Sequence, residues 1–336
     1  EIPTGAVRFN TDSSKMEVYI GSTWMEVAVS TPNLDGGARG IVMGGNPGVN
    51  NIDFFTISTQ GDASDFGDLL TASSLGASGG SRTRGICVIG TTSHSDKLEF
   101  ITISSTGNAT DFGDQSHSNH KRNISCGGSA TRMIVAGGVY GSNPYTYYNS
   151  MEFVTIASTG NTVDFGDMTE ARTQPFVASS PTRFVTLGGY KTPSPNASDI
   201  IEFVTTASTG NSQDFGDLME GNSGTPASCS NSTRAITFGG RDDDSNTMSK
   251  IQTVQIATGG NARKFGDLTE SVRFASGTSS KTRGVRIAGY KVPSNADTDT
   301  MDYVQIATEG NAVDFGNLTR STRSMGSGTS NDHGGL

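Results

Sequence analysis

The most conspicuous candidates for chemistry are acidic residues in a tetrapeptide, Asp-Phe-Gly-Asp, that returns along the chain. Several carboxylates held close together are what a calcium ion prefers. However, the fifth copy has Lys264 at the first acidic position, and the sixth has Asn317 at the second. Since neither carboxylate is needed in every copy, we expect a structural motif and no metal site. The carboxylates then accept backbone hydrogen bonds in a turn or pair with an arginine. The acidic positions are Asp65, Asp68, Asp111, Asp114, Asp164, Asp167, Asp214, Asp217, Asp267 and Asp314.

Arginine also recurs at one position of each repeat. If these arginines were gathered over one pocket, they would bind an anion. However, residues that occur once per repeat are distributed around a repeating fold. We therefore expect these arginines to make structural contacts. They are Arg39, Arg84, Arg132, Arg183, Arg234 and Arg283.

Residues for nucleophilic or acid-base catalysis do not occur at a recognisable spacing. The sequence contains neither a GxSxG nor an HExxH motif. His117 and His120 lie three residues apart, which on a strand or loop does not direct both rings to one metal, so we expect solvent-exposed histidines. The cysteines are far apart without a CxxC pair, and we interpret Cys87, Cys126 and Cys229 as small buried side chains. The chain is predicted to be no enzyme, with no catalytic residues and no cofactor.

A sixfold repeat must position all of these residues. Variants of the phrase Phe-Val-Thr-Ile-Ala-Ser-Thr-Gly-Asn-Thr-Val-Asp-Phe-Gly-Asp recur with spacings of 46, 53, 50, 50 and 50 residues. This period suits a four-stranded propeller blade. In each unit, a hairpin around Gly-Asn joins the third and fourth strands, a small-residue strand forms the first, and a strand from the recurring Arg to Gly-Gly forms the second. The recurring phenylalanine is expected between blades, at Phe66, Phe112, Phe165, Phe215, Phe265 and Phe315.

The two ends of the repeat region complement each other. The first unit begins at its second strand, Arg39 to Gly45, and the last ends in a first-strand segment, Arg320 to Ser330. Pairing of these segments would close a ring and remove exposed strand edges. The sequence therefore predicts an all-β protein with a six-bladed β-propeller of four-stranded blades over residues 34–336. A short β-meander over residues 1–33 precedes it.

Two resemblances accompany these patterns. The Gly-Gly pair in a repeat near 50 residues resembles the kelch class of propellers over residues 34–330. The repeated phrase, joined to Thr-Arg-Gly, resembles repeats in structural proteins of tailed bacteriophages. Residues 5–12, 16–19 and 21–24 are similar to a meander of phage fibre and tail proteins. These resemblances imply a tail fibre or capsid appendage, located on the virion and attached to other virion proteins through residues 1–33, with a homo-oligomer as an open alternative.

The loops between the second and third strands differ in every unit, whereas the turns between first and second strands and between third and fourth strands barely change. Since binding residues usually lie on irregular loops carried by a rigid scaffold, these loops are the predicted binding face. Aromatic platforms beside charged groups suit a carbohydrate or a protein patch, although drift in unconstrained loops would give the same contrast. The candidates are Tyr140, Tyr145, Tyr147, Tyr148, Tyr190, Lys191, Arg241, Asp242, Tyr290 and Lys291.

Composition narrows the class of function. The net charge of −9 and the absence of a basic cluster argue against nucleic-acid binding. The sequence contains no run of 18 apolar residues, so we do not expect membrane insertion. We expect a non-enzymatic virion structural protein whose propeller binds a host-surface glycan or protein. One alternative is a purely architectural decoration or joining protein without a receptor. Another is a glycan-cleaving propeller enzyme, for which Asp242 to Asp244 and Asp297 would be the only carboxylates to consider.

Overall fold

The structure is a computed structural model that describes residues 2–11, 15–26, 38–117, 120–142, 144–193, 196–292, 294–323 and 328–336. The described residues form antiparallel strands and no helix. The all-β prediction is therefore confirmed. The chain divides into two compact units, Glu1–Gly36 and Gly37–Leu336. The predicted boundary between residues 33 and 34 lies outside the described residues.

The first unit is a three-stranded antiparallel sheet of β1 (Val7–Asn10), β2 (Lys15–Ile20) and β3 (Thr23–Glu26). Val7 lies opposite Val18, which lies opposite Met25. Because directly opposed residues point to the same side of a sheet, these side chains share one face. The other face carries Arg8, whose guanidinium lies 4.2 Å from the centre of the Trp24 ring.

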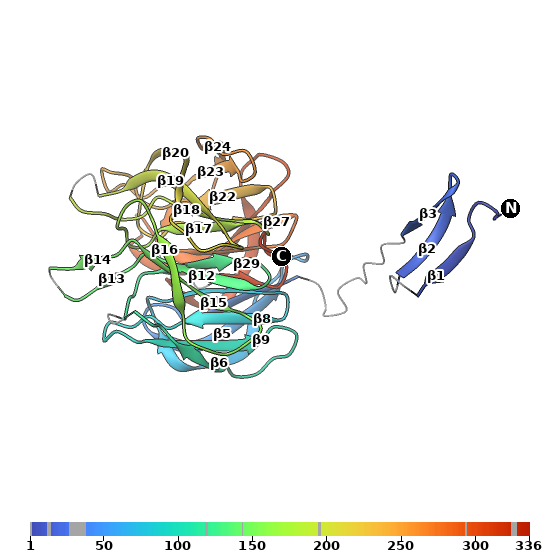
Figure 1. Cartoon of the computed structure of the whole chain (residues 1–336). Coiled ribbons are helices and arrows are strands. Elements are labelled where there is room, and N and C mark those ends of the chain that lie inside the picture. Colours follow the sequence, from blue (N-terminus) through green and yellow to red (C-terminus); the bar gives the residue numbers. More distant parts are fainter. Residues whose placement is uncertain are drawn as a thin grey trace. The chain divides into compact units, whose positions relative to one another are not determined.

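The described residues of the second unit (Figure 1) contain six sheets of four or five strands beside one two-stranded sheet, and in each of the six, four strands pair in the order first, second, third, fourth. The first sheet joins β30 (Gly328–Ser330), β4 (Arg39–Met43), β5 (Val49–Thr56) and β6 (Ser64–Ser73). The second joins β7 (Ala77–Gly80), β8 (Arg84–Val88), β9 (Lys97–Thr102) and β10 (Thr110–Asp114). The third joins β11 (Ser125–Gly128), β12 (Arg132–Ala136), β15 (Ser150–Thr155) and β16 (Val163–Asp167).

The remaining three sheets follow the same plan. The fourth joins β17 (Phe176–Ser179), β18 (Arg183–Leu187), β19 (Ser198–Thr205) and β20 (Gln213–Asn222). The fifth joins β21 (Ala227–Ser230), β22 (Arg234–Phe238), β23 (Lys250–Gln255) and β24 (Arg263–Asp267). The sixth joins β26 (Ser276–Ser279), β27 (Arg283–Lys291), β28 (Ala296–Gln305) and β29 (Val313–Thr322), and β25 (Val272–Arg273) also pairs with β27. A separate hairpin consists of β13 (Val139–Tyr140) and β14 (Thr146–Tyr147).

The first sheet combines the two ends of the second unit. β30 pairs antiparallel with β4, with Gly328 opposite Val42 and Ser330 opposite Gly40. This is the pairing that the sequence predicts for these segments. β30, from the end of the repeat region, thus completes the sheet that begins with β4.

The first strands of the six sheets touch one another in sequence. β7 contacts β11, β11 contacts β17, β17 contacts β21, β21 contacts β26, β26 contacts β30, and β30 contacts β7 again. Small residues are required where these strands approach, since a Cβ on Gly277 would lie 2.2 Å from the carbonyl oxygen of Ser228. The glycine- and serine-rich composition of these strands therefore reflects close packing.

The outer edge of each fourth strand is covered by the hairpin turn of the next sheet. The amide nitrogen of Gly107 donates to the carbonyl of Phe66 at 2.8 Å, and the Asn108 Oδ1 atom accepts from the amide of Asp68 at 3.1 Å. The same contacts return from the first sheet to the sixth, where Asp62 replaces asparagine and accepts from Asn317 at 3.0 Å. The recurring Gly-Asn therefore satisfies strand edges that would otherwise be open to other chains.

Apolar clusters fill the space between neighbouring sheets. Phe112 is 1% exposed and packs edge-on against Phe100, with ring centres 5.8 Å apart. Around it lie Ile86 and Val88 of the second sheet and Met133 of the third. All six recurring phenylalanines are buried. The repeat phrase thus supplies both the filling between sheets and the cover of their edges.

Candidate functional site

The recurring arginines bind the backbone of the neighbouring sheet. The Arg84 Nη1 atom donates to the carbonyl oxygens of Ile156 and Ala157 at 2.9 and 3.0 Å. Its guanidinium also lies 4.8 Å from the ring centre of Phe100. The other five arginines donate to carbonyls in the same way, so the alternative that they pair with the Asp-Phe-Gly-Asp carboxylates is wrong. A guanidinium offers several directed donors, which suits it to two carbonyls at the end of a strand.

The Asp-Phe-Gly-Asp carboxylates lie at the surface and make isolated contacts. Lys97 Nζ pairs with Asp114 at 2.6 Å, and Lys264 Nζ pairs with Asp267 at 2.8 Å. Among the described residues, no group of three or more His, Cys, Asp or Glu side chains could hold a metal ion. The recurrence of glycine in this motif has a steric explanation, because a Cβ on Gly113 would lie 2.3 Å from the carbonyl oxygen of Gly160.

Two sets of loops meet on one side of the second unit, which we call the loop face. In the described residues, one set lies between second and third strands (44–48, 89–96, 137–142, 144–149, 188–193, 196–197, 239–249, 288–292 and 294–298), and the other lies between fourth and first strands (74–76, 115–117, 120–124, 168–175, 219–226, 269–275 and 319–323), the strand ends within these ranges included. Isolated antiparallel bridges connect the sets at Arg122 and Val139, Thr173 and Tyr190, Ser223 and Arg241, and Asn46 and Arg323. The variable loops are therefore held in place by the loops that precede the first strands.

Three of the predicted tyrosines surround a cavity on the loop face. Tyr145, Tyr147 and Tyr190 line a space of about 380 Å³, together with Arg122 and Asn123. The rings of Tyr147 and Tyr190 are 6.0 Å apart and inclined by 32°. Leu75, Thr92, Val139, Thr173 and Gln174 complete the lining. The hairpin of β13 and β14 thus brings aromatic side chains from two variable loops to one place.

The polar residues of this cavity differ in how far their hydrogen bonding is satisfied. Arg122 donates to the carbonyls of Thr92 and Gly141 at 2.9 and 3.1 Å. The Asn123 Oδ1 atom is buried and has no hydrogen-bond partner among the described residues. A buried acceptor without a donor costs free energy, so a ligand hydroxyl or amide placed here would gain from the pairing.

The other two predicted tyrosines of the third loop pack on histidines. The rings of Tyr140 and His94 are 4.7 Å apart, as are those of Tyr148 and His117. The expectation of solvent-exposed histidines is therefore wrong, because His117 and His120 are half-buried. Burial, followed by the nearby Arg122, lowers the pKa of His94.

The predicted charged residues are mostly neutralised by neighbours. Lys191 Nζ lies 3.0 Å from Glu170, and Lys291 Nζ lies 2.8 Å from Glu270. The carboxylate of Asp242 accepts from the amide of Asn246 at 2.7 Å, within its own loop. These residues shape the loops.

Arg241 and Tyr290 lie in another part of the loop face, away from the residues that line the tyrosine cavity. Two residues that the sequence analysis missed, Arg273 and Arg323, place their guanidinium groups 5.1 and 4.3 Å from the centre of the Tyr290 ring. They occupy the loops before first strands, at the repeat position held by Arg122. Comparing these loops between repeats would have revealed three arginines at one position.

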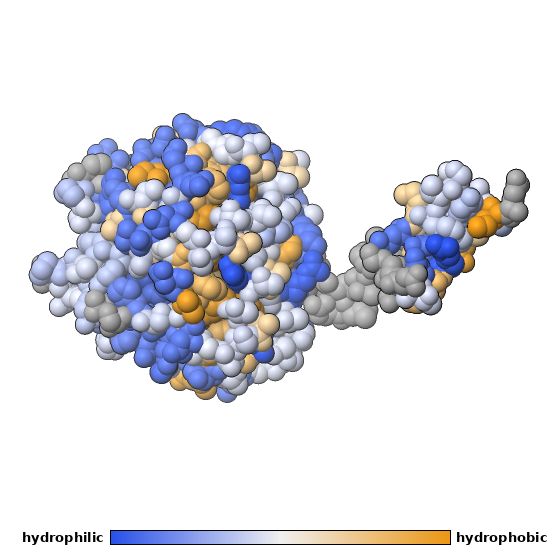
Figure 2. Space-filling model, viewed as in Figure 1, coloured by the Kyte–Doolittle hydropathy of each residue, from blue (hydrophilic) through white to orange (hydrophobic). Residues whose placement is uncertain are grey.

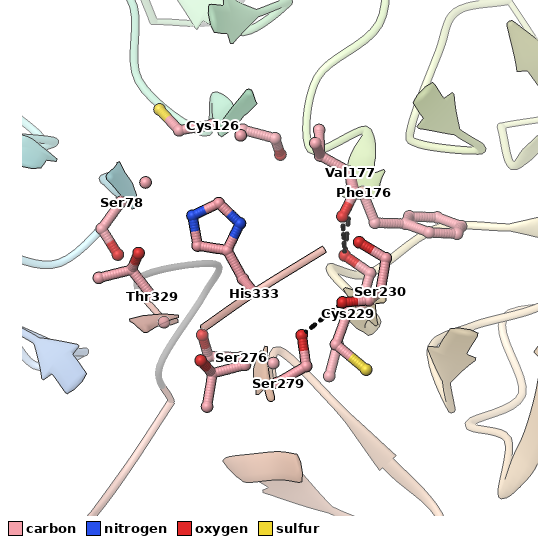
Figure 3. A pocket seen from close by; sticks show the side chains of 18 of the residues that line it. Ser78, Cys126, Phe176, Val177, Cys229, Ser230, Ser276, Ser279, Thr329 and His333 are labelled. Atoms are coloured by element: carbon pink, nitrogen blue, oxygen red, sulfur yellow. Dashed lines mark hydrogen bonds between the residues drawn. The ribbon is translucent and has the colours of Figure 1, made fainter. Parts of the chain in front are cut away.

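A second, smaller cavity of about 80 Å³ lies between the first strands (Figure 3). His333 points into it from the chain end. Its Nε2 atom donates to the carbonyl of Gly80 at 2.9 Å, and its Nδ1 atom accepts from Gly335 at 3.1 Å. Burial lowers the pKa of this imidazole. Both ring nitrogens are therefore occupied by the backbone.

Cysteines are found in the walls of this cavity. Cys229 is buried as expected, and so is Cys87 elsewhere in the core, but Cys126 is only half-buried, which corrects the expectation that all three are buried. Burial raises the pKa of the Cys126 thiol. A thiol held in its protonated form is a poor nucleophile, so we assign the Cys126 thiol a structural role in this cavity.

The sequence analysis also missed a set of buried carboxylates on the third strands. Glu202 pairs with the fully buried Arg172, and its Oε2 atom accepts from the amide of Thr169 at 2.8 Å. At the same repeat position, Gln252 accepts from the amide of Met219 at 3.0 Å. The signal was an acidic residue recurring within an apolar stretch. The set is Asp53, Glu99, Glu152, Glu202 and Asp302, with Gln252 in the fifth sheet.

Within the described residues, no helix is long and apolar enough to cross a membrane. Comparison of the chain with protein-family models and with curated proteins finds no match.

Proposed function

We propose that the second unit is a six-bladed β-propeller of kelch type, and that the chain is a non-enzymatic structural protein of a bacteriophage particle. The loop face binds a host-surface glycan or protein, and residues 1–33 attach the chain to another virion protein. The propeller assignment is supported by two series of contacts that return to their starting sheet. One joins the six first strands, and the other joins each hairpin turn to the preceding sheet.

The tyrosine cavity is the observation that carries the binding proposal. Tyr145, Tyr147 and Tyr190 present ring faces that can stack on the apolar face of a sugar. Asn123, whose Oδ1 atom has no partner among the described residues, belongs to the lining of the same cavity. A sugar hydroxyl would supply the missing donor. Since a volume of about 380 Å³ lies within the usual range of ligand sites, one or two sugar rings would fit.

The apolar face of the first unit supports the attachment proposal. Its exposed side chains include Phe9 at 61%, Val7 at 58% and Met25 at 52%. Figure 2 shows apolar residues at the surface of this unit. A three-stranded sheet of this size buries too little apolar area to be stable alone, so another protein surface must cover it. Electron microscopy of purified particles labelled with gold-conjugated antibody should detect the chain on them. A chain that lacks residues 1–37 should be absent from the particles.

The binding proposal is tested with a Tyr147→Ala/Tyr190→Ala variant of the full chain. We expect its binding to an array of bacterial surface glycans to fall at least 10-fold, because both ring platforms are removed. Tyr140→Ala, which lies outside the cavity lining, serves as the matched control. Unchanged binding of the double variant, with an unchanged melting temperature, would overturn the assignment of this cavity. A chain that is present on particles but has no effect on adsorption would favour the architectural alternative.

A further inference from the structure

Arginines gather in the loop face around Tyr290. Arg273 and Tyr290 are backbone partners in the pairing of β25 with β27. The Arg273 and Arg323 guanidinium groups lie 5.1 and 4.3 Å from the centre of the Tyr290 ring. This ring therefore supports two cations through its π-face.

Arg241 belongs to the same group. A Cβ on Gly224 would lie 2.8 Å from the Cδ atom of Arg241, and the amide of Phe274 donates to the carbonyl of Gly224 at 2.8 Å. Arg273 precedes Phe274 in the chain and lies 5.3 Å from its ring centre. The loop before β26 thus brings Arg273 towards Arg241. Burial, and next the charge of Arg241, lower the pKa of Arg273.

The guanidinium groups of Arg241 and Arg273 lack acceptors. Neither forms a hydrogen bond or an ion pair with a described residue, and the Nε atom of each is buried without a partner. Arg323 is different, because its Nε atom donates to Asp297 at 2.6 Å. Every other arginine buried to a similar degree in the repeat donates to a carbonyl or a carboxylate.

Three carboxylates of this region have other partners. Asp242 accepts from Asn246, Glu270 pairs with Lys291, and Asp243 accepts from the amide of Ala197 at 3.3 Å. Two half-buried cations that repel one another and have no counter-ion are costly unless an anion joins them. The missing component is therefore a group with several acceptor oxygens.

We propose that Arg241, Arg273 and the Tyr290–Arg323 pair form a subsite for the carboxylate or sulfate group of an acidic saccharide. This inference rests on the proposed glycan-binding function and assigns its ligand class. A guanidinium binds a planar carboxylate or a sulfate through two parallel hydrogen bonds. The face of Tyr290 holds the guanidinium groups of Arg273 and Arg323 beside the place of the anion.

The experiment is calorimetric titration of the full chain with three probes: trigalacturonate, inorganic sulfate and the neutral maltotriose. The test variant is Arg241→Gln/Arg273→Gln, and the matched control is Arg82→Gln, an exposed arginine outside the loop face. We expect the affinity for trigalacturonate to fall at least 10-fold in the test variant and to stay unchanged in the control. Binding to the wild type should weaken as salt is added, because the contact is between charges.

The outcomes separate this inference from the proposed function. Equal trigalacturonate affinity in the wild type and the test variant would overturn the anion subsite. Binding of maltotriose that depends on Tyr147, without any binding of trigalacturonate or sulfate, would overturn it as well, while leaving glycan binding intact. Arginine-dependent binding of sulfate alone would support the anion subsite but contradict an acidic saccharide as its ligand.

A variant that keeps the positive charge at residue 241 separates a loss of binding from a loss of folding. Arg241→Lys retains the cation but loses the paired donors, so we expect an intermediate loss of trigalacturonate affinity. Because the double variant removes two mutually repelling charges, its melting temperature should be equal to or above that of the wild type. A lower affinity in Arg241→Gln/Arg273→Gln with an unchanged affinity in Arg241→Lys would assign the effect to charge alone and contradict the directed geometry.

Discussion

The turns that cover the strand edges and the loop face are built from the same chain repeat, yet they treat polar groups in opposite ways. At the turns, Asn108 and its counterparts each meet a backbone amide of the neighbouring sheet, and each recurring arginine meets carbonyl oxygens. On the loop face, Asn123, Arg241 and Arg273 retain unpartnered polar atoms. At these positions, the side chains of the repeated turns are satisfied within the protein, whereas three side chains of the loop face leave donors or acceptors for a ligand.

This difference indicates where substitutions should affect stability and where they should affect binding. A repeated contact that joins neighbouring sheets contributes to the folded state six times, so its geometry is tightly restricted. A loop-face residue contributes little to folding beyond its local turn, and surface substitutions of this kind usually change stability by no more than about 0.5 kcal/mol. The following variants test that separation.

The largest loss is expected for Gly113→Ala, which would place a Cβ 2.3 Å from the carbonyl oxygen of Gly160. Since that atom belongs to the covering turn, the contact between sheets must open, and we expect the free energy of unfolding to fall by about 4 kcal/mol or more. Gly107→Ala is the matched control, because its φ of +154° is similar but nothing lies within 4 Å. Backbone strain alone predicts a loss of about 1–3 kcal/mol there. Urea unfolding measures both, and equal losses would contradict the steric argument.

The next effect concerns two arginines in equivalent loops. Arg172 is fully buried against Glu202, so Arg172→Met leaves a buried carboxylate unpaired and should cost about 3 kcal/mol or more. Arg172→Met/Glu202→Gln should recover most of this loss, since Gln252 occupies the same position in the fifth sheet. Arg273→Gln should leave the unfolding free energy nearly unchanged. A large destabilisation by Arg273→Gln would remove the distinction between the two regions.

A smaller effect separates the two contacts of the recurring arginines. Arg183 donates to the carbonyl of Ile256 at 2.7 Å and also lies 4.5 Å from the centre of the Phe203 ring. Arg234 makes the same carbonyl contact at 2.8 Å. In its sheet, however, the position that corresponds to Phe203 is Thr253, which lies opposite Ile236 and has no aromatic ring. We expect Arg183→Gln to cost about 2 kcal/mol and Arg234→Gln to cost less by about 0.5–1 kcal/mol. Thermal unfolding of the two variants gives the comparison, and the reverse order would contradict a role for the aromatic ring.

The smallest effect is a change in pH dependence at Glu99. Burial raises the pKa of this carboxyl. A carboxyl whose pKa is raised by folding stabilises the protein most at low pH, and this contribution is lost as the pH rises through the raised value. Glu99→Gln should therefore gain stability relative to the wild type as the pH increases above 4.5, the ordinary value. Melting curves over a pH series check the sign, and a relative loss with rising pH would show that the ionised carboxylate is favoured by its partners.

Sequence predicted the strand order of the sheets and the pairing of β30 with β4, because the repeated phrase marks the same strands in every unit. It also selected the tyrosines of the cavity, since loops that differ between units stand out against a constant background. It did not find Arg273 or Arg323, whose relation to Tyr290 depends on how two loops from different parts of the chain meet. Nor did it find the partner of the recurring arginines, because a backbone carbonyl carries no sequence signal.

The pairing of Gly328 with Val42 also has a consequence for synthesis. At about 5–20 residues per second, the ribosome adds the residues between these two positions in on the order of half a minute. Throughout that time, β4 is made but the strand that will occupy its open edge is not. A nascent chain of this protein therefore presents an unpaired edge of β4 until β30 leaves the ribosome.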